Sequence, residues 1–211
     1  MKTGVPIVLF IVIINGLISC HLQPKRLPIL GDADYRQHPI TGKTDTIYPV
    51  IADFILTDQD SNLITNSTFD DRIYVADFIF LSCPTICPKM TKEMLKVYHA
   101  FDDNKHVNFI SHTIDPEYDT IPRLRSYSTS LGVQTERWHF VTAPADTIYK
   151  LAASYYATVY PDSTVPGGFT HSGGFLLIDK QRHIRGVYDG TDTTETGRLI
   201  RDIHVLLKER I

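Results

Sequence analysis

Two cysteines, Cys83 and Cys87, are the residues whose type and spacing most directly suggest chemistry. They follow a run of β-type residues at 73–80 and precede a stretch at 89–100 whose apolar side chains recur at helical spacing. Each cysteine precedes a proline, which disfavours helical geometry at the cysteine, so we expect Cys87 at a helix N-cap and Cys83 in the loop before it. A helix N-terminus stabilises a thiolate, so the pair is placed to stay reactive or to bind a metal.

Four chemistries are open to such a Cys-x-x-x-Cys pair. A structural disulfide would close only a small loop, which adds limited stability by the loop-length argument. Thiol–disulfide exchange is the second, although thioredoxin-type enzymes normally use two intervening residues. Peroxide reduction is the third, but Phe80 and Pro84 stand where peroxiredoxins place a threonine three residues before the reactive cysteine. Binding of a soft metal ion by two thiolates is the fourth, and it needs a third ligand.

His171 is the candidate for that third ligand. It lies in the Gly-rich segment 166–174, just before a predicted strand at 175–178, and the glycines let backbone segments approach closely. In a thioredoxin-like fold the loop before this strand faces the cysteine loop. Two thiolates and one imidazole suit Cu(I) and can adapt to Cu(II), so this set predicts a site for one copper ion.

The elements that must position these residues alternate between strand and helix. The turn-rich segment 58–62, between two apolar runs, predicts a β-hairpin over 54–65. Further strands are expected at 73–80, 107–114, 138–141, 174–179 and 183–188, and helices at 89–101, 121–131, 146–158 and 195–208. This order predicts an α/β fold, a thioredoxin-like sandwich with an N-terminal β-hairpin extension.

The N-terminus reads as an export signal. Lys2 and the apolar run Ile7–Ile14 precede Leu17-Ile18-Ser19-Cys20, which resembles the lipobox of bacterial lipoproteins. We expect Cys20 to carry the lipid that anchors an exported domain on the extracytoplasmic side of a membrane. An uncleaved anchor is the alternative, but the apolar run is shorter than the ~20 residues that a spanning helix needs. An oxidising export compartment would require a reductant to keep a cysteine pair able to bind metal.

Length and composition fit one domain with appendages. The 211 residues are 43% hydrophobic and 21% charged, which allows an ordinary buried core. We expect a signal peptide at 1–19, a membrane tether with an irregular extension at 20–49, and the folded domain at 50–211. The net charge of −3 and the absence of a basic stripe in the sequence argue against a nucleic-acid partner.

Four motifs together resemble the Sco/SenC family of copper chaperones, in order over about residues 50–208. They are Phe54-x-Leu56-Thr57-Asp58-Gln59, Cys83-x-x-x-Cys87-Pro88, Asp115-Pro116-Glu117-x-Asp119-Thr120, and His171-Ser172 up to Leu177-x-Asp179. The resemblance implies a thioredoxin fold that binds one copper ion through Cys83, Cys87 and His171. It further implies a membrane-anchored chaperone that helps to metallate the CuA centre of a respiratory cytochrome c oxidase. The implied partners are the CuA-bearing subunit and an upstream copper donor or thiol reductant.

One position departs from the family pattern, and two other functions use the same residues. Many relatives carry an acidic residue directly before the histidine, where this chain has Thr170; such neighbours fix the orientation of a ligating imidazole. As a thiol–disulfide oxidoreductase, the protein would use Cys83 and Cys87 as a redox-active pair to keep oxidase cysteines reduced. Copper or redox sensing is the third function.

Several residues outside this set are expected to be structural. Asp115 and Asp119 should organise a turn and cap the following helix. We expect His112 and His139 to serve packing or to lie on the surface. The remaining candidates, Met90 and Met94, are expected in the core.

Overall fold

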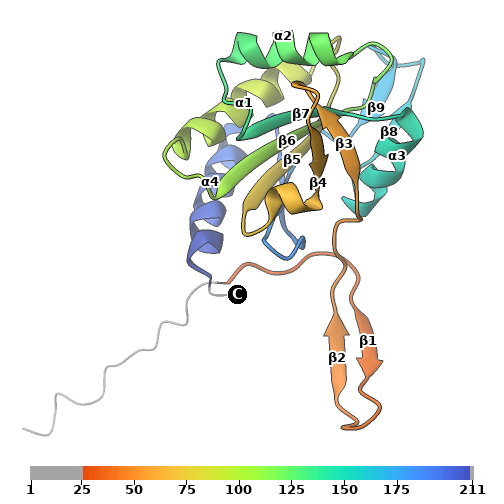
Figure 1. Ribbon diagram of the computed structural model, residues 1–211, viewed down its shortest axis with the longest axis vertical. Coiled ribbons are helices and arrows are strands. Elements are labelled where there is room, and N and C mark those ends of the chain that lie inside the picture. The colour runs from red at the N-terminus through yellow and green to blue at the C-terminus, as the bar shows by residue number, and fades with distance from the viewer. Residues whose placement is uncertain (1–25, 210–211) are drawn as a thin grey trace, which may run out of the picture.

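A seven-stranded mixed sheet forms the centre of the protein, in a computed structural model that describes residues 26–209 (Figure 1). The strand order is β11-β10-β5-β6-β7-β3-β4. Three strands at the centre run parallel: β5 (Ile73–Ile79), β6 (Val107–Thr113) and β7 (Trp138–Thr142). The strands that flank them pair antiparallel: β3 (Ile55–Asp58), β4 (Leu63–Thr65), β10 (Gly174–Ile178) and β11 (Ile184–Asp189).

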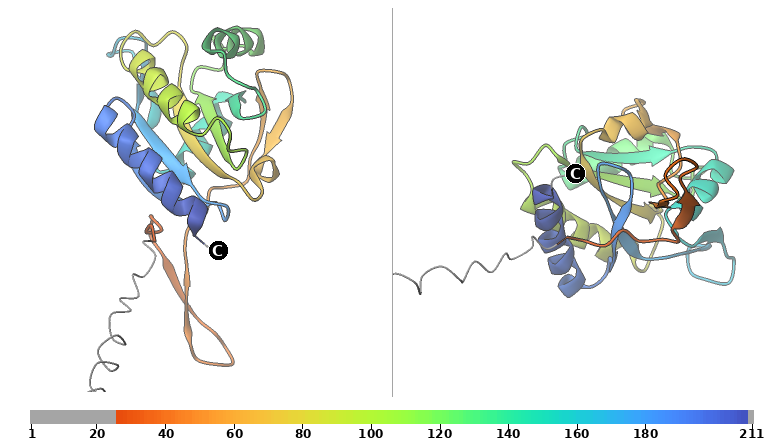
Figure 2. Two further views of the ribbon diagram at one scale, coloured as in Figure 1. Left: turned by 90° about the vertical axis from the view of Figure 1, so that its left-hand side faces the viewer. Right: turned by 90° about the horizontal axis from the view of Figure 1, so that it is seen from below.

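Helices cover both faces of the sheet (Figure 2). On one face α1 (Cys87–Ala100) packs against α4 (Thr193–Lys208), and α2 (Ile121–Leu131) packs beside β7. The other face is covered by α3 (Ala145–Ser154). These elements form the α/β, thioredoxin-like sandwich that the sequence predicted.

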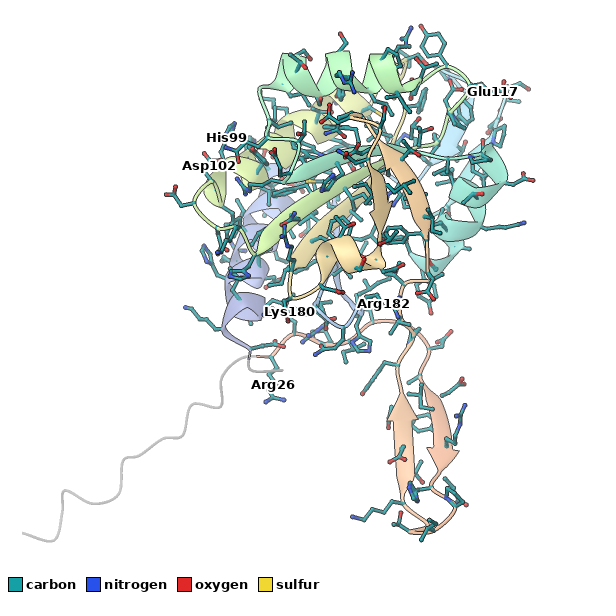
Figure 3. The ribbon with its side chains drawn as sticks, viewed as in Figure 1. Arg26, His99, Asp102, Glu117, Lys180 and Arg182 are labelled. Carbon is teal, nitrogen blue, oxygen red and sulfur yellow. The ribbon has the colours of Figure 1, made fainter. Side chains whose placement is uncertain are left out.

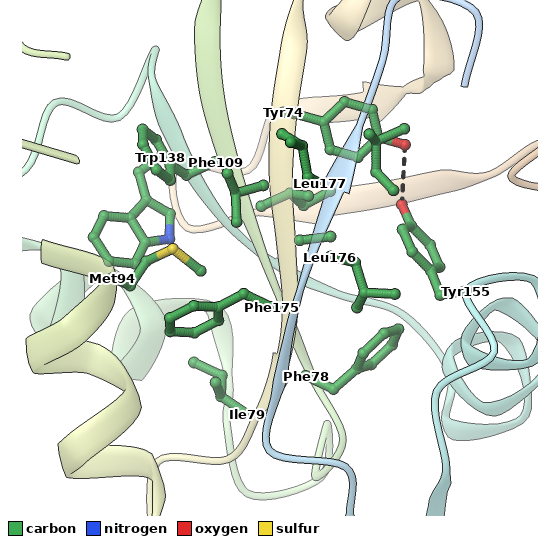
Figure 4. Close-up of a cluster of buried hydrophobic side chains, with 14 of the residues drawn as sticks. Tyr74, Phe78, Ile79, Met94, Phe109, Trp138, Tyr155, Phe175, Leu176 and Leu177 are labelled. Carbon is green, nitrogen blue, oxygen red and sulfur yellow. Dashed lines mark hydrogen bonds between the residues drawn. The ribbon is translucent and has the colours of Figure 1, made fainter. Parts of the chain in front are cut away.

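The central strand β5 is buried at every residue, and its side chains alternate between the two layers. Figure 4 shows Tyr74 and Phe78 on the side of Tyr155, whose hydroxyl forms a 3.2 Å hydrogen bond with that of Tyr74. On the opposite side Ile79 lies near Met94 of α1. Met90 and Met94 are fully buried, which confirms them as core residues.

Local sequence signals placed most element boundaries to within a few residues. The 54–65 hairpin is present as β3 and β4, and Gly132 ends α2 in the left-handed conformation with φ 68°. The helix after the cysteine pair begins two residues before the predicted range 89–101, and its N-cap lies one residue before the predicted Cys87. Its N-cap is Ile86, whose carbonyl accepts hydrogen bonds from the Lys89 and Met90 amides, so Cys87 is the first helical residue. Pro88 fits there because the first-turn amides have no partner within the helix.

The extension expected to be irregular at 20–49 contains a second hairpin. Strands β1 (Asp34–Gln37) and β2 (Thr44–Ile47) pair antiparallel and project from the domain (Figure 1). The His38 amide donates to the Lys43 carbonyl at 2.8 Å, and the Gly42 amide donates to the His38 carbonyl at 3.0 Å, which closes the turn. Polar residues on both sides of these short strands left no alternating pattern in the sequence.

Two further elements lie in loops, and the predicted export signal lies outside the described residues. A 3-10 helix spans Asn66–Phe69, and the Gly-rich loop holds a small hairpin of β8 (Val159–Pro161) and β9 (Phe169–His171). The signal peptide at 1–19 and the lipidation site Cys20 remain predictions. Between residues 26 and 209 no helix has the length and apolarity to cross a bilayer.

Candidate metal site

The structure brings Cys83, Cys87 and His171 together at one end of the central strand. Cys83 lies in the loop after β5, Cys87 opens α1, and His171 ends β9. Their potential ligand atoms all lie within 4.8 Å of one another, and Cys87 Sγ is 3.7 Å from His171 Nε2. A sulfur at ~2.3 Å and a nitrogen at ~2.0 Å from one ion are about 3.7 Å apart at a trigonal angle. The three donors therefore fit a single soft metal ion with little movement.

Phe80 is the common support of the cysteine loop and the histidine hairpin. It directly follows β5, and the His171 ring meets its ring edge-on at a centroid distance of 5.7 Å. Gly167, with φ +92°, lies so close to Phe80 that a Cβ there would be 2.9 Å from the ring. This close approach positions the hairpin over the cysteines.

The two thiols are free and differ in acidity. Burial disfavours the Cys83 thiolate, but hydrogen bonds from the Cys87 and Thr85 amides and side chains outweigh it, so the pKa of Cys83 is lowered. The pKa of Cys87 is raised far above its usual value by burial and by the neighbouring charges of Cys83 and Asp77. In the metal-free pair Cys83 is therefore the more acidic thiol and the first to lose its proton as pH rises.

His171 has an imidazole that stays neutral at pH 7, because burial lowers its pKa. Its Nδ1 atom is buried, and no group among the described residues hydrogen-bonds to it. The preceding Thr170 donates its hydroxyl to Asp162 at 2.9 Å, across the β8–β9 hairpin. Thr170 therefore fastens the hairpin to an acidic residue. The edge-on contact with Phe80 and the contact of Nε2 with Cys87 Sγ restrain the His171 ring.

Asp119 supports the cysteine loop in a way that sequence reasoning missed. Its buried carboxylate accepts the Leu81 amide at 3.0 Å and the Thr113 hydroxyl at 2.6 Å. The predicted helix-capping role of Asp119 is wrong, because Thr120 occupies the N-cap of α2. The Asp115 carbonyl does organise the turn, accepting the Asp119 amide at 2.8 Å. Asp119 faces Leu81 only because β5 and β6 are neighbours, which local sequence does not reveal.

Sequence reasoning also missed Asp77, although the sequence contained a signal for it. It is a carboxylic acid inside the apolar run 73–80, and in β5 it is fully buried. Burial raises the pKa of Asp77 to about 7, against a weaker opposing hydrogen bond from Ser111. His112 and His139 are buried core residues away from the cysteine pair; His112 Nδ1 is hydrogen-bonded to the Asp77 carbonyl at 3.1 Å, and His139 Nδ1 to Asp58 at 3.2 Å.

Two small pockets reach the buried sulfurs. One, of about 200 Å³, is lined by Cys83, His171 and Phe80, among others; the second, of about 190 Å³, is lined by Cys83, Cys87 and Tyr127, among others. Cys83 lines both. Cys83 is thus reached from both pockets, His171 from the first and Cys87 from the second.

The sandwich and its converging Cys₂His set define a thioredoxin-fold protein with a candidate soft-metal site. The sequence model of SCO1/SenC matches residues 42–208, and the chain belongs to this family.

Proteins with similar sequences and similar solved structures agree with this family membership. A SCO1 protein homologue of Bacillus subtilis (strain 168) is 25% identical over 152 residues, covering 71% of this chain and 79% of that protein. A SCO1/SenC family lipoprotein from Bacillus anthracis aligns with a TM-score of 0.69 and 27% identity, over 75% of this chain and 95% of that one. Copper-bound ScoI of Bradyrhizobium japonicum has the same fold, with a TM-score of 0.61 and 23% identity over 72% of this chain and 98% of its own.

Proposed function

We propose that this protein is a copper chaperone that binds one copper ion through Cys83, Cys87 and His171 and serves the assembly of a cytochrome c oxidase. The observation that carries the proposal is the convergence of two thiols and one imidazole within 4.8 Å. Thiolates select Cu(I), and imidazole suits copper in either common oxidation state. Membership of the family supports the proposal. Bradyrhizobium japonicum ScoI has a structure with copper bound, and another solved relative, BsSco, is a member of the Sco family of cytochrome c oxidase assembly proteins.

Loading requires thiol protons to leave the site, because copper binds thiolates. His171 is neutral and able to act as a ligand, and Cys83 gives up its proton more readily than Cys87, whose pKa is raised. Delivery is then ligand exchange, in which a thiolate of the recipient displaces His171 before the cysteines. His171 is the natural first ligand to leave because it is only half-buried, on a three-residue strand at the rim of a pocket.

The recipient and the tether belong to the same proposal. The copper would go to the CuA-bearing subunit of the oxidase, on the extracytoplasmic side of the membrane, with the chaperone held there by lipid at Cys20. An upstream donor or a thiol reductant would reload the site. Sco-family membership and the lipobox-like segment ending at Cys20 support this arrangement.

The decisive experiment removes the imidazole. In His171→Ala we expect the reduced protein to lose at least about 100-fold in Cu(I) affinity, because two thiolates remain without the third donor. Affinity is measured anaerobically by competition with a chromogenic Cu(I) chelator. His183→Ala is the matched control, because His183 is a half-buried histidine that contacts Asp179 away from the site. Equal copper affinity of His171→Ala and the parent protein would refute the three-ligand site.

A thiol–disulfide oxidoreductase is the second candidate, favoured by the unequal acidity of the two thiols. The Cys83 thiolate would attack a substrate disulfide and expel one substrate thiolate, forming a mixed disulfide. Cys87, once deprotonated, would then displace the second substrate thiolate and leave a Cys83–Cys87 disulfide. Full oxidase assembly in cells that carry copper-free His171→Ala would favour this function over copper delivery.

A further inference from the structure

The β1–β2 hairpin is an ordered element that the copper site does not use. Every residue of both strands is exposed, and among the described residues β1 and β2 pair only with one another. A two-stranded ribbon without a buried face is marginal in water, so a contact outside the domain would stabilise it. The SCO1/SenC match begins at residue 42, and β1 therefore lies outside the shared family region.

The tip of this hairpin presents one large apolar side chain between two cations. Ile40 is 87% exposed at the turn, and His38 Nδ1 holds the turn by accepting the Ile40 and Thr41 amides at 3.3 Å. Arg36 and Lys43 lie on either side, and the sequence between them contains no carboxylate. The nearest carboxylates, Asp45 opposite Arg36 and Asp34, lie outside the Arg36–Lys43 tip, nearer the domain. An exposed aliphatic side chain framed by two cations complements an anionic lipid surface.

The hairpin leaves the domain at the same end as the start of the described chain. Arg185 donates to the carbonyls of Leu27 and Pro28, which fastens this segment to the body. This end is opposite the copper site, because the turn after β10 lies beside the start of β5 and the cysteines follow its end. Figure 3 shows Arg26 and Arg182 at the end from which the hairpin projects, with Glu117 at the far end.

The lengths of tether and hairpin also match. The seven residues from Cys20 to Leu27 span at most ~25 Å when extended. The seven from Ala33 to the tip at Ile40 span ~23 Å at the rise of a strand. We propose that the hairpin tip, Arg36 to Lys43, contacts the anionic headgroups of the membrane that holds the chain. The contact rests on the proposed lipid attachment at Cys20, and it would turn the copper site away from the bilayer toward its recipient.

Limited proteolysis of the full-length lipidated protein tests this contact. The protein is reconstituted in phosphatidylcholine vesicles with or without phosphatidylglycerol, so the tether is the same in both samples. Trypsin cleavage after Arg36 and Lys43 is followed by mass spectrometry. We expect cleavage to be about tenfold slower on the anionic vesicles, and the protection to disappear at ~1 M salt, where screening shortens the electrostatic range to ~3 Å.

Two variants distinguish a contact made by the hairpin tip from the effect of adding a negative charge elsewhere on the surface. Ile40→Asp keeps both cleavage sites, and we expect it to lose the protection. Leu63→Asp, at an apolar residue that is 71% exposed in the β3–β4 hairpin, should keep it. Equal cleavage on both vesicle types, or a protected Ile40→Asp, would overturn the lipid contact. Protection only in native membranes that contain other proteins would overturn it in favour of a protein partner.

Flotation and copper titration of the same samples keep the hypotheses apart. A chain that floats with neither vesicle type would overturn the tethered geometry, and with it this contact. If the parent protein in these samples binds no copper, the proposed function is wrong, but the protease result still tests the lipid contact.

Discussion

At the scale of single residues, Cys83 and Cys87 are nearly equal in exposure and unequal in chemistry. Their exposed fractions are 7% and 6%, so access does not distinguish them. Amide and hydroxyl donors surround the Cys83 sulfur, whereas Cys87 lies deeper, near the Asp77 carboxyl. Hydrogen bonding to a thiolate lowers a pKa, and burial near negative charge raises it.

This difference predicts selective alkylation of the reduced, metal-free protein. At pH 7 iodoacetamide should modify Cys83 at least about tenfold faster than Cys87, since the thiolate is the nucleophile. Peptide mapping at short reaction times measures both rates. In Thr85→Val, which removes the hydroxyl 3.7 Å from Cys83 Sγ, the Cys83 rate should fall. Faster modification of Cys87 would contradict the assignment.

At the scale of elements, the loop between β8 and β9 decides where His171 lies. Gly167 and Gly168 both have positive φ, +92° and +80°, but only Gly167 abuts Phe80 and Pro84. A Cβ at Gly168 would meet no atom within 4 Å. Substitutions at the two glycines therefore share the backbone strain, but only a substitution at Gly167 also disturbs the packing of the hairpin on the cysteine loop.

An alanine at each glycine tests this packing. Both substitutions should cost ~1–2 kcal/mol of unfolding free energy from the left-handed backbone. Only Gly167→Ala should also displace Phe80 and His171, and we expect it to lower Cu(I) affinity about tenfold relative to Gly168→Ala. Denaturant unfolding and chelator competition measure the two effects. Equal copper affinities of the two variants would show that the packing of Gly167 against Phe80 does not position His171.

At the scale of the whole molecule, two buried ionisable groups give opposite dependences on pH. Burial raises the pKa of Asp77 to about 7 and lowers the pKa of His112 to about 4. The folded protein thus keeps the Asp77 proton that the unfolded chain releases near pH 4, so this group makes the fold less stable as pH rises to 7. His112 acts in the opposite sense, since the unfolded chain takes up a proton below pH ~6.5 that the fold excludes.

Asp77→Asn isolates the first contribution, because His112 is common to both proteins. Between pH 4 and 7 the unfolding free energy of the parent should fall relative to the variant by up to about 4 kcal/mol, at 1.36 kcal/mol per pKa unit. Urea unfolding of the reduced, metal-free proteins across this range measures the difference. A difference that does not change with pH would show that Asp77 is ionised in the fold.

Local sequence patterns were sufficient for most of the fold. The apolar run at 73–80 and the helical spacing after Cys87 predicted β5 and α1. A buried strand or helix face needs apolar side chains at regular positions along a short stretch of chain, so a local sequence pattern reveals it. Residue type and spacing nominated Cys83 and Cys87 as soft-metal donors, and the Gly-rich segment before a predicted strand singled out His171 among the nine histidines. The β1–β2 hairpin escaped prediction because its exposed strands carry no apolar alternation.

Only the tertiary structure decided how these donors meet and in which state. The 3.7 Å approach of His171 to Cys87 depends on Gly167 packing against Phe80, a contact between segments more than eighty residues apart. The tie from Asp119 to Leu81 depends on the parallel pairing of β5 and β6. The protonation of each thiol follows from burial and from donors gathered by the fold. Sequence thus determined which groups are present, and packing set their distances and charges, because both depend on neighbours far away in the chain.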